Sequence, residues 1–467
     1  FTRAVDYGFS KYREEAAKLW GEDAMLADTV RAIRQFRPDV VVSRWTATAS
    51  DGHGHHLFSG YLTPLAVAAA ADPARFPEHL AEGLTAWQAK KLYNMPRVNF
   101  AEDVTDLLMI NTGRYDPVTG SSYFEIGMQG RSQQKTQQMG QLEFHGPQLS
   151  YLRRIDAKPT EKESSVFDGI DTSIAGIADR GTDTNRQLRT QLEQLQAAAE
   201  ALLQAYNPLS PEALIDDLQD GLALARRIEQ DIEGAEAQRL VREKIAEFEQ
   251  ALLSAAGVRI DALADAETVV PGDTIRVVVR TYVDAEAVEV SLVELEAPAG
   301  WKVAEADEKE LANEAGARRN DQASTERYFD VTVPADARRT QPYWLERPRR
   351  EFLYDWDGVS EERGLPFRRN LLQAQLELRA GETELSVARD VVHRERDPVR
   401  GELRRRLDVV PAVSISPSTR LIIARTSADE SVYDLQVSLR NHSMKPQDAA
   451  LRVSAPDGWN VTLENPT

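Results

Sequence analysis

A short β-branched run between two helical patterns constrains the fold of the first part of this chain. The stretch Glu22–Phe36 repeats apolar residues at the spacing of a helix, and Pro38 ends that stretch. The run Val40–Val42 follows, and an uninterrupted β-branched run is typical of a strand buried within a parallel sheet. Leu57–Ala71 then has the pattern of a helix packed on this sheet. Strand, loop and helix in this order predict an α/β domain.

The sequence pattern changes twice after this region. Residues 184–255 are rich in Ala, Leu, Gln, Glu and Arg, which favour helix, so we expect two or three helices ending before Gly257. We interpret them as a spacer or a small bundle. From about Val258 the apolar residues alternate with period two, and Thr274–Arg280 follows a Pro-Gly-Asp turn. Short alternating strands between turns predict a β-sandwich.

An internal repeat suggests a second sandwich. Pro298–Val303 matches Pro456–Val461, and each contains a Pro-x-Gly-Trp turn. Each unit follows an expected alternating strand, Val288–Leu295 in the first copy and Ala450–Val453 in the second. We expect each tryptophan to fill a sandwich core, with stacking on a sugar as the alternative.

These patterns divide the chain into four expected segments. Residues 1–160 would form the α/β domain and 161–256 a helical linker or bundle. Residues 257–404 would form one β-sandwich, and 405–467 part of a second.

The composition excludes several classes of function. The 467 residues carry a formal net charge of −19, which disfavours binding to nucleic acid. The chain has no cysteine, so thiolate metal sites and cysteine nucleophiles are excluded. No apolar run approaches the roughly 18 residues that a membrane span needs, so we expect no transmembrane segment.

A histidine cluster is the strongest sign of chemistry. His53, His55 and His56 are three of the seven histidines in the chain. They follow the carboxyl end of the expected strand, where open α/β sheets place their ligands. Neutral imidazole is a common zinc ligand. From composition alone, a metal site and a solvated loop with a chance cluster are both open.

The stretch Arg37–Val42 and the loop after it resemble the PIG-L (LmbE-like) zinc-dependent N-deacetylases. That family has a P-D-V-V strand followed by an H-P-D-H loop, and His53 and His56 match its two histidines. Gly54 and His55 replace the Pro and Asp of the loop. The resemblance implies a Rossmann-like domain in which His56 binds zinc at the start of a helix. It also implies that His53 is catalytic, by stabilising the oxyanion or passing a proton.

A second block, Gly127–Gln137, resembles a helix of the same family that ends in H-x-S-Q. Ser132 and Gln133 could line the substrate pocket or cap the helix, and Asp51 is a further candidate for a substrate contact. Other stretches resemble a large branch of the family that carries Ig-like β-sandwich modules. They are Gly83–Tyr93, Phe167–Thr172 and Gln341–Leu345.

The resemblance also implies that part of the active site is missing from this sequence. The family's A-H-P-D-D-E motif supplies two zinc ligands and the general base, and it is absent from this sequence. We expect it upstream of Phe1, which would make the chain an N-terminally truncated fragment with one zinc ligand of three and little or no activity.

The resemblance predicts hydrolysis of the acetamide of an N-acetylated amino sugar or glycoconjugate, with Zn²⁺ as cofactor. The alternative is a non-catalytic modular protein that binds carbohydrate or a cell surface. A metallohydrolase of another reaction type on the same scaffold is a third hypothesis. The modular architecture suggests an extracellular or periplasmic location.

Overall fold

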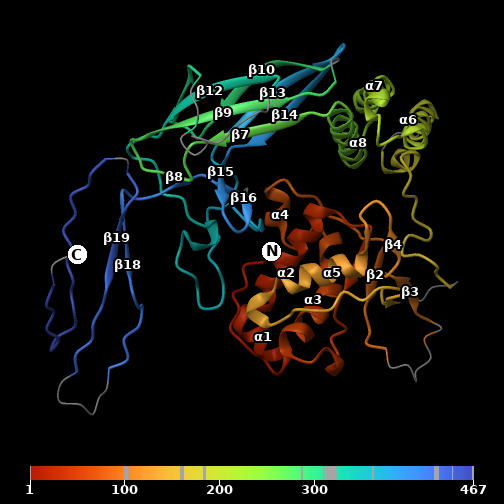
Figure 1. The fold of residues 1–467 in the computed structure, drawn as a ribbon. Coiled ribbons are helices and arrows are strands. Elements are labelled where there is room, and N and C mark those ends of the chain that lie inside the picture. The colour runs from red at the N-terminus through yellow and green to blue at the C-terminus, as the bar shows by residue number, and fades with distance from the viewer. Residues whose placement is uncertain are drawn as a thin grey trace. The chain divides into compact units, whose positions relative to one another are not determined.

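The chain forms two compact units, and each contains two stretches of sequence (Figure 1). The first contains residues 1–172 and 341–368, and the second contains residues 173–340 and 369–467. The computed structural model describes residues 2–98, 104, 106–157, 162–181, 186–285, 288–308, 311, 323–359, 362–424, 431–443 and 445–464.

The segment 341–368 joins the first unit through backbone pairing with the N-terminal residues. Val5 N–H donates to the carbonyl of Phe352, and Tyr354 N–H donates to the carbonyl of Arg3, both at 2.8 Å. The family-like stretch Gln341–Leu345 therefore belongs to the unit that holds the histidine cluster.

The first unit is a mixed α/β structure around a sheet of order β1-β2-β6-β3. β1 and β2 are parallel, whereas β6 runs antiparallel to both β2 and β3. Its helices are α1 (Arg13–Trp20), α2 (Glu22–Phe36), α3 (Gly54–Ala71), α4 (Pro77–Ala81) and α5 (Tyr123–Ser132), with short 3-10 turns at Ala49–Asp51, Lys135–Gln137 and Tyr343–Leu345. Its strands are β1 (Val40–Ser43), β2 (Lys91–Asn94), β3 (Leu108–Asn111), β4 (Tyr115–Asp116), β5 (Ser121–Ser122) and β6 (Leu149–Arg154).

The local predictions for this unit are largely confirmed. The expected helix coincides with α2, and the β-branched run forms β1 with a parallel partner. The second helix begins at Gly54, three residues earlier than expected, so the first turn of α3 contains His55 and His56. His53 is its extended N-cap residue, and Gly54 N–H donates to the carbonyl of Ser10 at 2.9 Å.

Two clusters of buried apolar side chains pack against the sheet. Val30 of α2 and Phe58 of α3 pack with Leu92 of β2 in one buried cluster. Tyr93 of β2 packs with Leu152 of β6 in the other. Since neighbouring residues of a strand point to opposite faces, both faces of β2 are covered.

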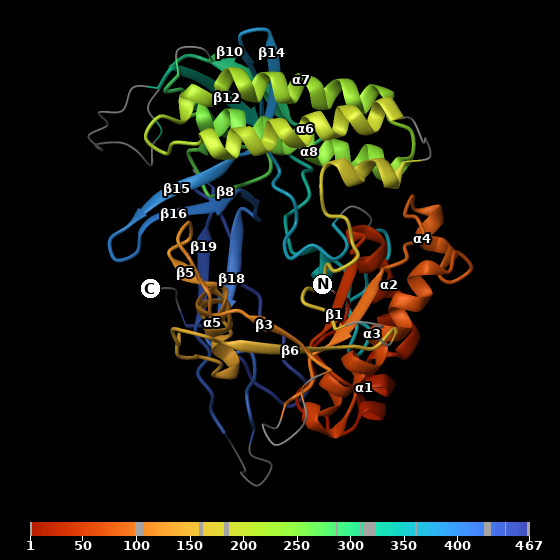
Figure 2. The same cartoon turned by 90° about the vertical axis from the view of Figure 1, so that its right-hand side faces the viewer.

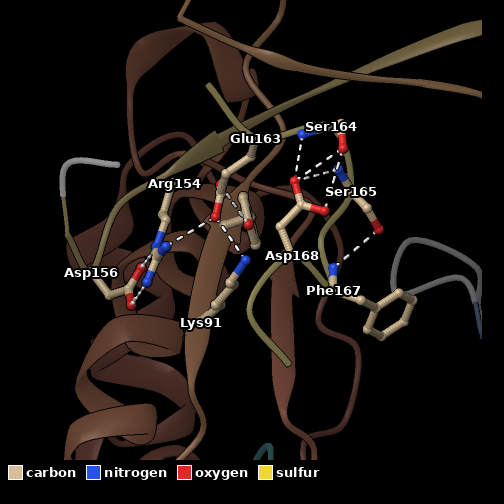
Figure 3. Close-up of polar contacts among 9 residues, drawn as sticks. Lys91, Arg154, Asp156, Glu163, Ser164, Ser165, Phe167 and Asp168 are labelled. Atoms are coloured by element: carbon tan, nitrogen blue, oxygen red, sulfur yellow. Dashed lines mark hydrogen bonds and ion pairs between the residues drawn. The ribbon is translucent and has the colours of Figure 1, made fainter. Parts of the chain in front are cut away.

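A polar network fastens the segment after β6 to the sheet (Figure 3). Lys91 Nζ donates to Glu163 at 2.7 Å, and Arg154 donates to the same oxygen at 2.9 Å. Asp168 accepts hydrogen bonds from the backbone N–H groups of Ser164 and Ser165. The family-like stretch that begins at Phe167 is thus held by a turn next to a buried ion pair.

The second unit begins with the expected helices, which lie side by side (Figure 2). They are α6 (Arg186–Ala205), α7 (Ile215–Asp231) and α8 (Ala235–Ala255), with 3-10 turns at Ala175–Arg180 and Pro211–Leu214. Leu192, Leu222 and Leu252, one from each helix, are fully buried in a core that the helices share with the following strands. The prediction of two or three helices is confirmed.

Two sheets follow and share this core. One has the order β11-β12-β9-β7-β15-β16 and the other β10-β13-β14. Val277 and Val331 of the first sheet are buried with Leu376 of the second. The strands of these sheets are β7 (Arg259–Ala264), β9 (Thr274–Tyr282), β10 (Val288–Glu296), β11 (Lys302–Ala306), β12 (Thr325–Thr332), β13 (Gln373–Ala380), β14 (Thr383–Asp390), β15 (Val392–Asp397) and β16 (Gly401–Arg406). β8 (Thr268–Val269) and β17 (Asp408–Val409) form a separate parallel pair. The period-two interpretation of this region is confirmed.

The two copies of the internal repeat differ in their surroundings. The same turn closes both, since Trp301 N–H donates to Pro298 and Trp459 N–H to Pro456. Trp301 packs against the core, as expected, but Trp459 is 45% exposed.

The expectations of a strand over Ala450–Val453 and of a buried Trp459 are wrong. Between residues 413 and 464, the described residues form only β18 (Val413–Pro417) and β19 (Val437–Asn441), paired antiparallel. A two-stranded hairpin offers no second sheet against which an indole could be buried.

The sequence predicted no transmembrane segment. Within the described ranges, no helix combines the length and the apolar character that crossing a bilayer requires.

Candidate functional site

The histidine cluster lies where the parallel strands β1 and β2 end. β1 ends at Ser43, opposite Asn94 of β2, and a loop with the 3-10 turn Ala49–Asp51 leads from β1 into α3. The site is therefore at the carboxyl edge of the parallel part of the sheet, where α/β proteins bind ligands.

His56 is held on three sides. Its Nδ1 lies 2.9 Å from the carbonyl oxygen of Asp51. A carbonyl can only accept, so Nδ1 carries a hydrogen, and in the neutral imidazole Nε2 then keeps its lone pair. The Trp45 ring stacks on the imidazole with centroids 3.5 Å apart and planes inclined by 12°. The His53 ring lies 3.8 Å from the same centroid. Two rings cannot share one imidazole face at these distances, so His56 lies between them.

His53 occupies the junction between loop and helix. Its Nδ1 is buried, and no described residue forms a hydrogen bond with it. The exposed ring of Phe9 lies 5.7 Å away. Burial, and then the neighbouring His56, lower the pKa of His53, which favours the neutral imidazole. A neutral histidine can accept a proton at one ring nitrogen and donate a hydrogen bond from the other.

His55 points to a different set of residues. Its Nδ1 is 2.7 Å from the Ser10 hydroxyl, and its ring stacks on Tyr7 with centroids 4.6 Å apart. The Trp20 ring meets it edge-on, also at 4.6 Å. Burial is the main cause that lowers the pKa of His55. No sequence signal assigned this histidine a role, and its contacts tie the N-terminal segment to the start of α3.

Asp51 is buried, with 3% of its surface exposed, and its carboxylate is engaged within the loop. One oxygen accepts from Thr46 N–H at 2.9 Å, and the other accepts from the Thr46 hydroxyl at 3.0 Å. The candidate substrate contact thus closes the loop and points its own carbonyl at His56. No sequence pattern singled out Trp45 or Thr46, which become neighbours of the histidines only through this loop.

Ser132 and Gln133 lie at the end of α5. The Ser132 hydroxyl donates to the Met128 carbonyl at 2.8 Å and accepts from Gln141 N–H at 3.1 Å. Gln133 is the exposed C-cap residue. Both positions match the capping alternative, and no hydrogen bond or ring contact between described residues joins them to His53 or His56.

His56 could hold a metal ion through one atom. With Nδ1 engaged by a backbone carbonyl, Nε2 presents its lone pair in the arrangement typical of a zinc-bound histidine. Among the residues that the structure describes, no set of three or more His, Asp or Glu side chains could hold a metal together.

The sequence was also compared with known proteins. No protein-family model matches the chain, and no curated protein matches it either.

Proposed function

We propose that this chain is part of a zinc-dependent N-deacetylase of the PIG-L type. The substrate would be an N-acetylated amino sugar or a glycoconjugate, and the products would be acetate and a free amine. The observation that carries the proposal is the fixed orientation of His56 beside His53 at the carboxyl edge of β1 and β2. We further propose that the α/β unit has a Rossmann-like fold and that the paired sheets of the second unit have an Ig-like fold.

The two histidines would have different roles. His56 would contribute one zinc ligand through Nε2, because Asp51 engages its other nitrogen. Bound zinc would lower the pKa of a coordinated water and polarise the acetamide carbonyl. His53 would donate a hydrogen bond to the substrate oxygen as negative charge develops on it. The proposal assigns the other ligands and the general base to the family's A-H-P-D-D-E motif, which residues 1–467 do not contain.

The test uses protein expressed from the full open reading frame that contains residues 1–467. Zinc content and acetate release from N-acetylglucosaminides are measured for the wild type, His56→Ala and His53→Ala. We expect His56→Ala to lose both zinc and activity. His53→Ala should keep zinc, while its kcat falls about 10²–10³-fold because an oxyanion contact is lost.

His145→Ala is the matched control. The His145 side chain is 83% exposed and pairs with Glu125 in the same unit, so both zinc content and activity should stay unchanged. A His56→Ala protein that retains full zinc and acetate release would refute the proposal.

A second candidate function is non-catalytic carbohydrate binding by the C-terminal part. The exposed Trp459 ring lies 5.9 Å from the Tyr433 ring, and aromatic faces of this kind can stack on sugars. If this function holds, Trp459→Ala abolishes glycan binding and leaves acetate release unaffected. Glycan binding at a surface would fit an extracellular or periplasmic protein. We therefore propose that location for this protein.

A further inference from the structure

We propose that Trp45 is a positioning residue that holds His56 as the Nδ1–H tautomer, with Nε2 directed to the ligand. The inference deepens the proposed function, and only its metal-binding experiment depends on that function. It rests on the stacked rings of Trp45 and His56 and on the way the loop between β1 and α3 is fixed.

The stacking restricts the imidazole. With Trp45 on one face and His53 on the other, the His56 ring cannot turn over without separating these contacts. The hydrogen bond to the Asp51 carbonyl then decides that the Nδ1 edge of the ring faces the loop. Ring flipping would place Cδ2 against the carbonyl and would move Nε2 to the position that Cε1 now occupies.

The backbone around Trp45 is held at both ends. The buried Ser43 hydroxyl donates to the Trp45 carbonyl at 2.7 Å, where β1 ends. A Cβ added to Gly60 of α3 would lie 2.5 Å from Ala47 N, so only glycine lets the helix approach the loop this closely. Trp45 is therefore placed by the fold and not by its contact with His56.

The Thr46–Asp51 hydrogen bonds complete the arrangement. Because the Asp51 carboxylate accepts both the N–H and the hydroxyl of Thr46, the loop closes on itself just after Trp45. The indole and the Asp51 carbonyl thus reach His56 from one closed loop. Carbonyl partners of metal-binding histidines commonly fix the tautomer in this way.

The first experiment reads the tautomer directly. Side-chain ¹⁵N shifts of histidine are recorded on the 467-residue chain at about pH 8, where imidazoles are neutral. His56→Gln identifies the His56 signals. We expect a pure Nδ1–H tautomer in the wild type, a mixture in Trp45→Leu, and recovery of the pure tautomer in Trp45→Phe, which restores an aromatic face.

Trp87→Leu is the matched control. Trp87 lies in the same unit, and its indole N–H donates to the Pro38 carbonyl, away from the histidines. This variant should leave the His56 tautomer unchanged. A Trp45→Leu protein with the wild-type tautomer would overturn the inference.

The second experiment measures zinc affinity on the product of the full open reading frame, by competition with a chromophoric chelator. We expect Trp45→Leu to weaken zinc binding about tenfold. If the wild type binds no zinc but its tautomer depends on Trp45, the positioning role stands and the deacetylase proposal fails. If zinc binds and neither affinity nor tautomer depends on Trp45, the deacetylase proposal survives and the positioning role is refuted.

Discussion

The hydroxyl of Tyr93 donates a 2.7 Å hydrogen bond to Oε2 of Glu163, and Lys91 donates to Oε1 at the same distance. Tyr93 is fully buried and Lys91 is 6% exposed. Burial by itself would raise the pKa of Glu163, but the bonds from Lys91 and Tyr93 hold it below its ordinary value. Burial, and then the bond to Glu163, raise the pKa of Tyr93. The Glu163 carboxylate therefore accepts the hydrogen bonds of two buried donors, the Tyr93 hydroxyl and the Lys91 ammonium group.

Replacing Glu163 by Ala should destabilise the first unit by about 3 kcal/mol, because it leaves a buried ammonium group without its carboxylate. Glu163→Gln should cost less, since an amide oxygen can still accept one of the two bonds. Urea unfolding measures both changes, with the exposed Glu14→Ala as control. Equal midpoints for Glu163→Ala and Glu14→Ala would show that the network contributes nothing.

The stability of this unit should fall on acidification, partly through His79. Burial, and then Arg31 and Arg34, lower the pKa of His79 from 6.5 to about 4. The unfolded chain thus binds more protons than the folded one between these values. Stability is full above about pH 6.5 and decreases as the pH falls to about 4, by at most about 3 kcal/mol.

His79→Gln should flatten that part of the stability profile, which urea unfolding at several pH values measures. The exposed His145→Ala is the control and should keep the wild-type slope. An unchanged slope in His79→Gln would mean that His79 is protonated equally in both states.

Arg34 should be irreplaceable by lysine. Its guanidinium is fully buried and donates to five backbone carbonyls near the end of α3. These carbonyls belong to Ala69, Ala70, Asp72, Arg75 and Phe76. An ammonium group has three donors and no planar fork, so Arg34→Lys loses at least two of these five hydrogen bonds.

We expect Arg34→Lys to cost about 2 kcal/mol and to lower Tm by roughly 4–8 °C. Calorimetry measures the shift, and the same change at the exposed Arg114 should leave Tm unaltered. A matching Tm for the two variants would contradict a capping role for Arg34.

Gly54 should tolerate no side chain. A Cβ there would lie 2.2 Å from the Tyr12 carbonyl oxygen, which cannot move without breaking the contact between the N-terminal segment and α3. Gly54→Ala should therefore destabilise the unit by about 1–3 kcal/mol. In the helix α5, a Cβ on Gly127 meets no atom within 4 Å, so Gly127→Ala should be neutral or stabilising. The urea midpoint should fall for Gly54→Ala and stay or rise for Gly127→Ala, and a fall in both would contradict this interpretation of Gly54.

Local sequence patterns predicted part of the secondary structure. The helix Glu22–Phe36 and the strand Val40–Ser43 follow from apolar spacing and from the breaker Pro38, and the three helices of the second unit follow from a composition that favours helix. The local signal failed at Ala450–Val453, because an alternating pattern forms a strand only where a partner strand lies beside it.

By itself, the sequence determined that three histidines would gather after a strand of a parallel pair. Only the tertiary structure decided their directions. Successive residues on a helix point about 100° apart, so His55 and His56 face different neighbours once α3 begins at Gly54. Those neighbours, Tyr7 and Trp45, are brought to the helix by loops whose paths no local pattern specifies.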